Sequence, residues 1–255
     1  MPAAPVLPPK PVNRHISQEG RAEARKIRRR WMNDTADWAI RQFTDPEGWR
    51  RFLWTAAYHP TRPTVTNLAL LAVQAPFEIC RTYRQWQTEG RQVRKDEHGA
   101  LIYTSVLKAE DDGPEKLRGF GCGSLFRYSQ TDPADGADTD QQPPGPPHPR
   151  RPEELAEATR IHTPQTLHTG AQAIREALHA LTSAAPDLSP AEAGSAAHLA
   201  ALTLDTEPGA APPLASPETD DPDAARDALR DAAQRVTDTG RAVAAQVAAI
   251  HHPPF

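Results

Sequence analysis

Apolar residues recur at helical spacing through the first part of the chain. Ile27, Trp31 and Trp38 follow one another at intervals of four and seven residues, which places them on one face of a helix. Ser17 can cap this helix, and the pattern continues to about Phe43. We therefore predict a long first helix with a single apolar stripe.

Two shorter helices are predicted to follow. The order Asp45-Pro46-Glu47 is typical of a helix start, with a capping residue, a first-turn proline and an early acidic side chain. This helix is expected to reach about Tyr58. Its buried face should hold Trp49, Phe52 and Leu53. After a proline-rich break, Thr64 or Thr66 can start the next helix, which ends before Pro76.

The spacing changes from helical to β-like near Gly90. A short helix or turn over residues 82–87 precedes the change. Val93, the turn 96–99 and the β-forming run 101–107 predict a hairpin. Residues 117–128 predict a third strand, where alternating glycines indicate a bulge or a close backbone approach. The predicted fold class is α+β, with N-terminal helices packed on a small antiparallel sheet.

Composition divides the chain after Thr131. Residues 1–131 carry 21 Lys and Arg against 14 Asp and Glu, whereas residues 132–255 carry 8 against 19. All the Trp and Tyr residues lie in the first part. We predict a disordered leader over 1–15, a folded domain over 16–131, a Pro/Asp-rich linker over 132–152 and an Ala-rich helical or disordered region over 153–255.

The Ala-rich region offers further helical candidates. They are Pro152–Leu181, Pro190–Leu204 and Pro222–Ile250, the last capped by acidic residues within Asp220–Asp223. Because they lack aromatic side chains and are separated by proline-rich breaks, we expect loosely packed or partly disordered helices rather than a second well-built domain.

The opposite charges of the two halves indicate an anionic partner, such as a nucleic acid, for the basic half. The alternative is that the two halves attract each other.

Several classes of protein are excluded by pattern. The two cysteines, Cys80 and Cys122, form no C-x-x-C and predict neither a disulfide framework nor a thiolate zinc site. No run approaches a membrane span or a signal-peptide core, so we expect a cytoplasmic protein with no membrane partner. No catalytic triad, phosphate-binding loop or H-E-x-x-H is present, which predicts a protein that is not an enzyme and needs no metal or cofactor.

Three runs carry a resemblance to a known family. They are NLALLAVQAP from Asn67, YRQWQTEGRQVRKDEHGALI from Tyr83 and LFRYSQT from Leu125. In order and spacing they resemble the N-terminal single-stranded-DNA-binding domain of ArdC-type antirestriction proteins, over about Phe52 to Thr131. The middle run is the specific one, because it follows Y-R-x-W-x-x-x-G-R-x-V-R-K-G-E-x-G-I-x-I.

The chain departs from the family pattern at identifiable positions. Pro63-Thr64 replaces Tyr-Ser, Asp96 replaces a turn glycine and Arg127 replaces an Asp. Asp tolerates a left-handed backbone better than most residues, so the turn at Asp96 can survive. Full-length relatives also carry a zinc-metalloprotease-like domain with H-E-x-x-H, which this chain lacks.

The resemblance implies single-stranded DNA as the partner and suggests the residues that would bind it. A strand requires cations for its phosphates and exposed rings for its bases. The phosphate candidates are Arg84, Arg91, Arg94 and Lys95, and the stacking candidates are Tyr83, Trp86 and Tyr103. Asn67, Ser129 and Gln130 are the polar candidates.

Each candidate also has a structural alternative. Tyr83 and Trp86 share a helical face and can be core, Asn67 can be a helix cap, and the cations can be solvated charges on a turn. The Arg21–Arg30 cluster is either a DNA-binding arm or a solvated helix face.

The sequence thus predicts a non-catalytic, sequence-tolerant single-stranded-DNA-binding protein of a plasmid or other mobile element, with an antirestriction or conjugation role. The alternative is a protein-interaction scaffold that has lost DNA binding and uses its C-terminal region to bind a protein partner. A further hypothesis is that the acidic half competes with DNA, so that deleting residues 132–255 would tighten binding.

Overall fold

The computed structural model describes residues 17–59, 63–110, 113–134, 178–180, 182, 185–204, 206, 208–209 and 211–251, without the side chains of 107–117 and 249–251. The predicted leader and most of the predicted linker and Pro152–Leu181 helix therefore lie outside the described residues. Of that helix, residues 178–180 are described, and they are helical.

Three helices start where the sequence predicts. Helix α1 (Gln18–Arg41) is capped by Ser17, whose hydroxyl accepts the Gly20 N–H. A short 3-10 turn, η1 (Gln42–Thr44), leads to α2 (Pro46–Tyr58), where the Asp45 carboxylate accepts two backbone N–H groups. Helix α3 (Val65–Gln74) is capped by the Thr64 hydroxyl. These caps satisfy amide groups that a helix start leaves unpaired, as expected for Ser, Asp and Thr.

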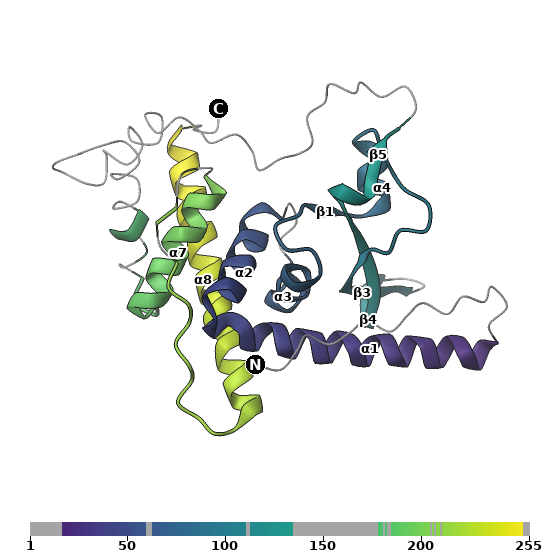
Figure 1. Cartoon of the computed structure of the whole chain (residues 1–255), viewed down its shortest axis with the longest axis horizontal. Coiled ribbons are helices and arrows are strands. Elements are labelled where there is room, and N and C mark those ends of the chain that lie inside the picture. The colour runs from purple at the N-terminus through teal and green to yellow at the C-terminus, as the bar shows by residue number, and fades with distance from the viewer. Residues whose placement is uncertain are drawn as a thin grey trace.

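The apolar stripe of α1 is buried only in its C-terminal half. Trp31 and Trp38 pack against the rest of the protein, but Ile27 is 45% exposed. Figure 1 shows why: α1 runs beneath α3 and the sheet, and its N-terminal end projects past them. The predicted stripe is therefore packed at Trp31 and Trp38 and exposed at Ile27.

The antiparallel strands form two small sheets. In the larger one, β4 (Gly113–Arg127) lies between β1 (Cys80–Arg81) and β3 (Ala100–Glu110). In the smaller one, β2 (Arg91–Val93) pairs with β5 (Thr131–Pro133), with Val93 opposite Thr131. The predicted hairpin between Val93 and residues 101–107 is wrong, because β3 pairs with β4 instead.

Short elements complete the sheet end of the fold. Helix α4 (Tyr83–Thr88) precedes β2, and a 3-10 turn, η2 (Tyr128–Gln130), joins β4 to β5. The third strand therefore ends one residue earlier than predicted, and Tyr128 lies in the turn. The predicted bulge is confirmed in β4, where the register shifts at Gly119 opposite Val106. Helices followed by small antiparallel sheets confirm the α+β class.

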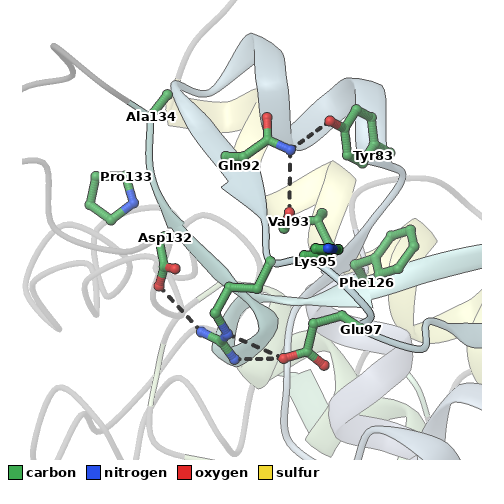
Figure 2. Close-up of a pocket in the computed structure, with 10 residues that line it drawn as sticks. Tyr83, Gln92, Val93, Lys95, Glu97, Phe126, Asp132, Pro133 and Ala134 are labelled. Atoms are coloured by element: carbon green, nitrogen blue, oxygen red, sulfur yellow. Dashed lines mark hydrogen bonds and ion pairs between the residues drawn. The ribbon is translucent and has the colours of Figure 1, made fainter.

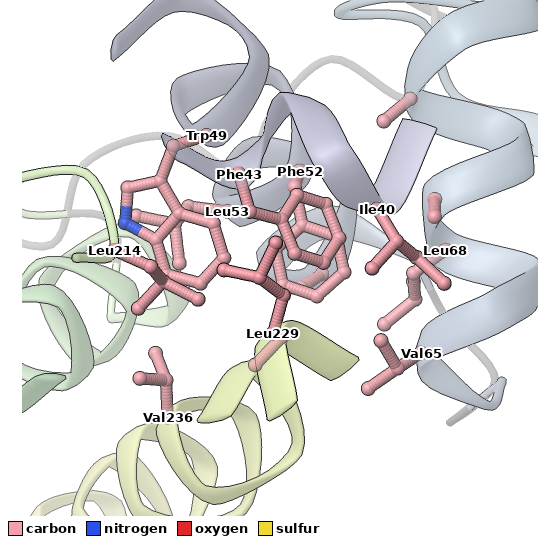
Figure 3. Close-up of a cluster of buried hydrophobic side chains, with 14 of the residues drawn as sticks. Ile40, Phe43, Trp49, Phe52, Leu53, Val65, Leu68, Leu214, Leu229 and Val236 are labelled. Carbon is pink, nitrogen blue, oxygen red and sulfur yellow. The ribbon is translucent and has the colours of Figure 1, made fainter. Parts of the chain in front are cut away.

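The C-terminal helices complete the main hydrophobic core. Helices α7 (Pro190–Thr203) and α8 (Pro222–His251) pack against each other and against α2. Figure 3 shows Leu214, Leu229 and Val236 meeting the aromatic cluster of α2 and η1. That cluster consists of Phe43, Trp49 and Phe52, each at most 1% exposed.

Polar contacts fix the same junction. The Trp49 indole N–H donates to the Ser195 hydroxyl at 2.9 Å, and the Leu214 N–H donates to the Phe43 carbonyl at 3.0 Å. The expectation of loosely packed C-terminal helices is thus wrong for α7 and α8. Alanine and glycine residues allow α7 and α8 to approach closely. A Cβ on Gly240 of α8 would lie 2.8 Å from a backbone oxygen of α7. The division of the chain at residue 132 stays a prediction, but the core crosses it.

One acidic side chain ties α7 to α8 and gives a pH-dependent prediction. Glu192 is 6% exposed, and its carboxylate accepts the Ser189 N–H at 2.7 Å and Arg235 at 2.5 Å. Burial raises the pKa of Glu192, but the hydrogen bonds from Ser189 and Arg235 outweigh it and leave the pKa below its usual value. Its stabilising contribution is therefore present above about pH 4.3, the unfolded value, and is lost as the pH falls through the folded pKa.

We expect Glu192→Gln to lower the free energy of unfolding by about 1–3 kcal/mol at neutral pH, since a charged hydrogen-bonded pair is lost. Urea denaturation of wild type and variant should show this gap narrowing as the pH is lowered past the carboxyl pKa. Glu23→Gln, on the exposed face of α1, is the matched control and should leave stability nearly unchanged. A stability difference between wild type and Glu192→Gln that stays constant on acidification would contradict the stabilising role of the Glu192 carboxylate.

Candidate nucleic-acid interface

An open pocket of about 940 Å³ lies where α4, β2 and the end of β5 meet (Figure 2). It brings together three of the residues predicted from sequence: Tyr83, Arg94 and Lys95. Phe126 supplies a second aromatic wall. Carboxylates of Glu97 and Asp132 also line it, so two cations face two anions.

Arg94 is held by acceptors of the protein itself. Its guanidinium contacts Glu97 at 2.8 Å, Asp132 at 3.3 Å and the Ser129 carbonyl at 2.6 Å. The hydrogen bond to Glu97 raises the pKa of Arg94, while hydrogen bonds from Gln130 and Arg94 lower the pKa of Glu97. Arg94 thus joins the 94–97 turn to β5 and η2, and a phosphate must compete for it.

Lys95, Arg84 and Tyr83 are the accessible members of the predicted set. Lys95 and Arg84 are exposed, and neither has an ion-pair partner among the residues that the structure describes. Tyr83 is 43% exposed, and its hydroxyl accepts the Gln92 side-chain N–H at 2.5 Å. The turn that carries Lys95 is kept by Asp96, whose φ of 64° confirms the left-handed conformation predicted for it.

Arg91 turns toward the protein. Its guanidinium donates to the Thr131 hydroxyl at 2.7 Å and to the Thr131 carbonyl at 3.0 Å, and it lies 4.0 Å from the centre of the Tyr128 ring. These contacts fasten β2 to β5 and η2. Arg91 is therefore less available to a phosphate than Lys95.

Trp86 and Gln130 are buried in the structure. Trp86 is 0% exposed, and its indole N–H donates to the Phe126 carbonyl at 2.8 Å. The Gln130 amide donates to Glu97 at 2.8 Å and to the His98 carbonyl at 2.9 Å. A buried ring leaves no free face for a base, which favours the structural alternative for Trp86.

Asn67 has a structural partner that the sequence pattern did not predict. Its amide donates to the Tyr103 carbonyl and accepts the Tyr103 N–H, at 2.9 and 2.8 Å. Gln74, two turns later on α3, makes the same pair of bonds with Leu101. Together these two side-chain amides pair with backbone N–H and C=O groups of Leu101 and Tyr103, on the edge of β3 that faces away from β4. In the sequence, the seven-residue spacing that places Asn67 and Gln74 on one helix face was the feature that could have predicted this shared contact with a strand.

Tyr103 lies in a second groove, apart from the first pocket. Its hydroxyl donates to Asn33 of α1, and burial raises its pKa. The groove has a volume of about 750 Å³ and also receives Arg29, Arg118 and Phe120. Sequence reasoning noted the arginine cluster of α1 but missed Phe120, whose signal was a phenylalanine flanked by glycines.

Ser129, the remaining predicted residue, is exposed beside the first pocket and uses its backbone carbonyl to hold Arg94. Within the described ranges, no group of three or more His, Cys, Asp and Glu side chains could hold a metal ion. No helix among them is long and apolar enough to cross a membrane.

A family model described as the N-terminal domain of anti-restriction factor ArdC matches residues 48–141. This part of the chain is an ArdC-type N-terminal domain. The resemblance predicted over about Phe52 to Thr131 is thus confirmed, and the protein carries a domain of an antirestriction family. The described lining residues of the first pocket all lie within the ArdC-type domain, whereas α1, α7 and α8 lie outside the match.

One solved structure that matches is the metal-free crystal structure of the antirestriction ArdC protein from plasmid R388. It is 15% identical, with a TM-score of 0.40, over 82% of this chain and 97% of that one. This TM-score is too low for a position-by-position comparison. No curated protein sequence matches the chain.

Proposed function

We propose that the ArdC-type domain binds single-stranded DNA without sequence preference and without catalysis. The observation that carries this proposal is the exposed ring of Tyr83 in the same open pocket as Lys95. A ring face stacks any base, and a cation beside it holds the adjoining phosphate, which together give sequence-tolerant binding. Coating of an incoming single strand would fit an antirestriction role.

Within this pocket the residues have different roles. Lys95 contacts phosphates together with Arg84, which follows Tyr83 on α4 outside the lining of the pocket, Tyr83 stacks a base, and Phe126 adds a second aromatic ring to the lining. Arg94 is a positioning residue, because its partners Glu97, Asp132 and Ser129 hold the turn that presents Lys95. The neutral charge balance of the pocket predicts weaker capture than a fully basic groove would give.

The test is fluorescence anisotropy of labelled single- and double-stranded oligonucleotides of about 30 nucleotides, across a salt series. We expect wild type to prefer the single strand. Lys95→Ala with Arg84→Ala should make the log–log salt slope less steep by about 1.4, since each single-strand phosphate contact contributes about 0.7. Tyr83→Ala should weaken binding by about 1–3 kcal/mol, and Tyr83→Phe should retain the stacking.

Arg230→Ala is the matched control, because Arg230 is a cation of α8, which contributes no residue to the pocket. It should leave the slope unchanged. A wild-type chain that binds no DNA at low salt would reject the proposal and favour the scaffold alternative.

A further inference from the structure

The second groove lies between α1, the start of α3 and the strands β3 and β4. Its lining residues are Arg29, Asn33, Thr64, Thr66, Tyr103, Val106, Arg118, Gly119 and Phe120, none of which lines the first pocket. Figure 1 shows α1 crossing beneath these strands. The groove therefore combines the ArdC-type domain with a helix outside the family match.

The apolar part of the groove is unusually open. Phe120 is 56% exposed and Val106 is 46% exposed, the highest values for large hydrophobic side chains among the described residues. An exposed aromatic ring beside an open groove has a free face on which a flat apolar ligand can stack.

The ring position is set by the backbone. The register of β3 and β4 shifts at this point: Val106 pairs with Gly119 and Leu107 with Leu117, which leaves Arg118 as the extra residue of the bulge. Gly119 has a φ of 147°, a conformation that a side chain would strain. The Arg29 guanidinium donates to the Phe120 carbonyl at 2.6 Å and ties the bulge to α1.

The groove is also positively charged. Arg29 and Arg118 line it, and none of its described lining residues is a carboxylate. Residues 18–31 of α1 carry six Lys and Arg against two Glu, and Arg21 and Arg25 precede Arg29 at intervals of four on the same helix face. The next acidic residues of α1 are already paired, Asp34 with Arg30 at 3.9 Å and Asp37 with Arg226 at 3.1 Å.

We propose that this groove is a second binding site for single-stranded DNA, in which Arg29 and Arg118 hold phosphates and a base stacks on Phe120. The site rests on the proposed function and extends it to α1. The cationic row of Arg21 and Arg25 continues the track along the helix. Phe120 and Phe126 lie six residues apart on β4, about 20 Å along a strand, so one DNA molecule can reach both grooves.

The experiment measures binding of the full chain to a labelled single-stranded oligonucleotide of about 30 nucleotides, across a salt series. Phe120→Ala should weaken binding by about 5- to 150-fold, and Phe120→Trp should restore it. Arg29→Gln with Arg118→Gln should reduce the salt slope by about 1.4, and Arg29→Lys alone should leave it unchanged. Phe77→Ala, an exposed ring outside both grooves, is the matched control.

Thermal unfolding of each variant confirms that the fold is intact. If Phe120→Ala and the double arginine variant are folded and bind as wild type does, while the Lys95 and Tyr83 variants lose affinity, the second site is overturned and the proposed function stands. If wild type binds no single strand, both fail. A peptide of residues 132–152 is the alternative ligand. If the wild-type chain binds this peptide, and the groove variants abolish peptide binding but leave DNA binding unchanged, then the groove binds an acidic peptide and the proposal is overturned.

Discussion

A fragment limited to residues 48–141, the extent of the family match, is expected not to fold as a stable unit. Its aromatic cluster would lose Phe43, which precedes the fragment in the sequence, and Leu214, Leu229 and Val236, which follow it. Trp49, Phe52 and Leu53 are each 0% exposed in the full chain, so the fragment would present a large apolar surface to water. The Trp49 indole N–H would also lose its acceptor, Ser195.

Urea denaturation followed by near-ultraviolet circular dichroism measures this loss. The fragment should lack a cooperative transition and should bind a hydrophobic dye, as expected when specific packing is absent. The control is a chain in which residues 136–176 are replaced by a flexible Gly/Ser linker of about 20 residues, which keeps α1, β5, α7 and α8. It should unfold cooperatively, close to wild type. A fragment 48–141 that unfolds cooperatively by itself would contradict the shared core.

The same packing affects the test of whether the acidic half competes with DNA for the basic half. Deleting residues 132–255 would remove most of β5 together with α7 and α8, so weaker DNA binding would report unfolding. Residues 218–238 carry seven of the nineteen Asp and Glu of this half, against three Arg. Competition with DNA is therefore better tested by neutralising exposed residues at the start of α8, such as Asp220 and Asp223.

Trp86→Ala is expected to lower the free energy of unfolding by about 3–5 kcal/mol, the cost of removing a large buried aromatic side chain. Trp86 is 0% exposed, packs edge-on against Tyr128 with ring centres 6.0 Å apart, and donates to the Phe126 carbonyl. Trp86→Phe keeps part of the packing but leaves that carbonyl without its donor, which should cost about 1–3 kcal/mol. Chemical denaturation measures both changes.

Tyr83→Ala is the matched control, because Tyr83 lies three residues earlier on α4 and is exposed. It should change stability by only about 0.5 kcal/mol while weakening DNA binding. The two aromatic residues of one helix are thus expected to separate stability from binding. A Trp86→Ala variant that keeps wild-type stability but loses DNA affinity would instead make Trp86 a stacking platform.

The sequence by itself determined the elements whose causes are local. Ser17, Asp45 and Thr64 cap helices because their side-chain oxygens accept amide groups two or three residues away. The left-handed turn at Asp96 and the bulge at Gly119 likewise follow from the conformations that these residues tolerate. The motif order around Tyr83, Arg84 and Trp86 was sufficient to identify the ArdC-type domain.

Only the tertiary structure decided what depends on contacts between distant residues. Val93 pairs with Thr131, and Trp49 packs with Ser195 across 146 positions, because strand partners and core partners are chosen by burial and geometry that no local pattern encodes. The candidate site was divided for the same reason. Lys95 and Tyr83 share one pocket, and Tyr103 joins Arg29 and Phe120 in another. The fold also brings Asp132 to Arg94, which its sequence neighbour Glu97 already contacts.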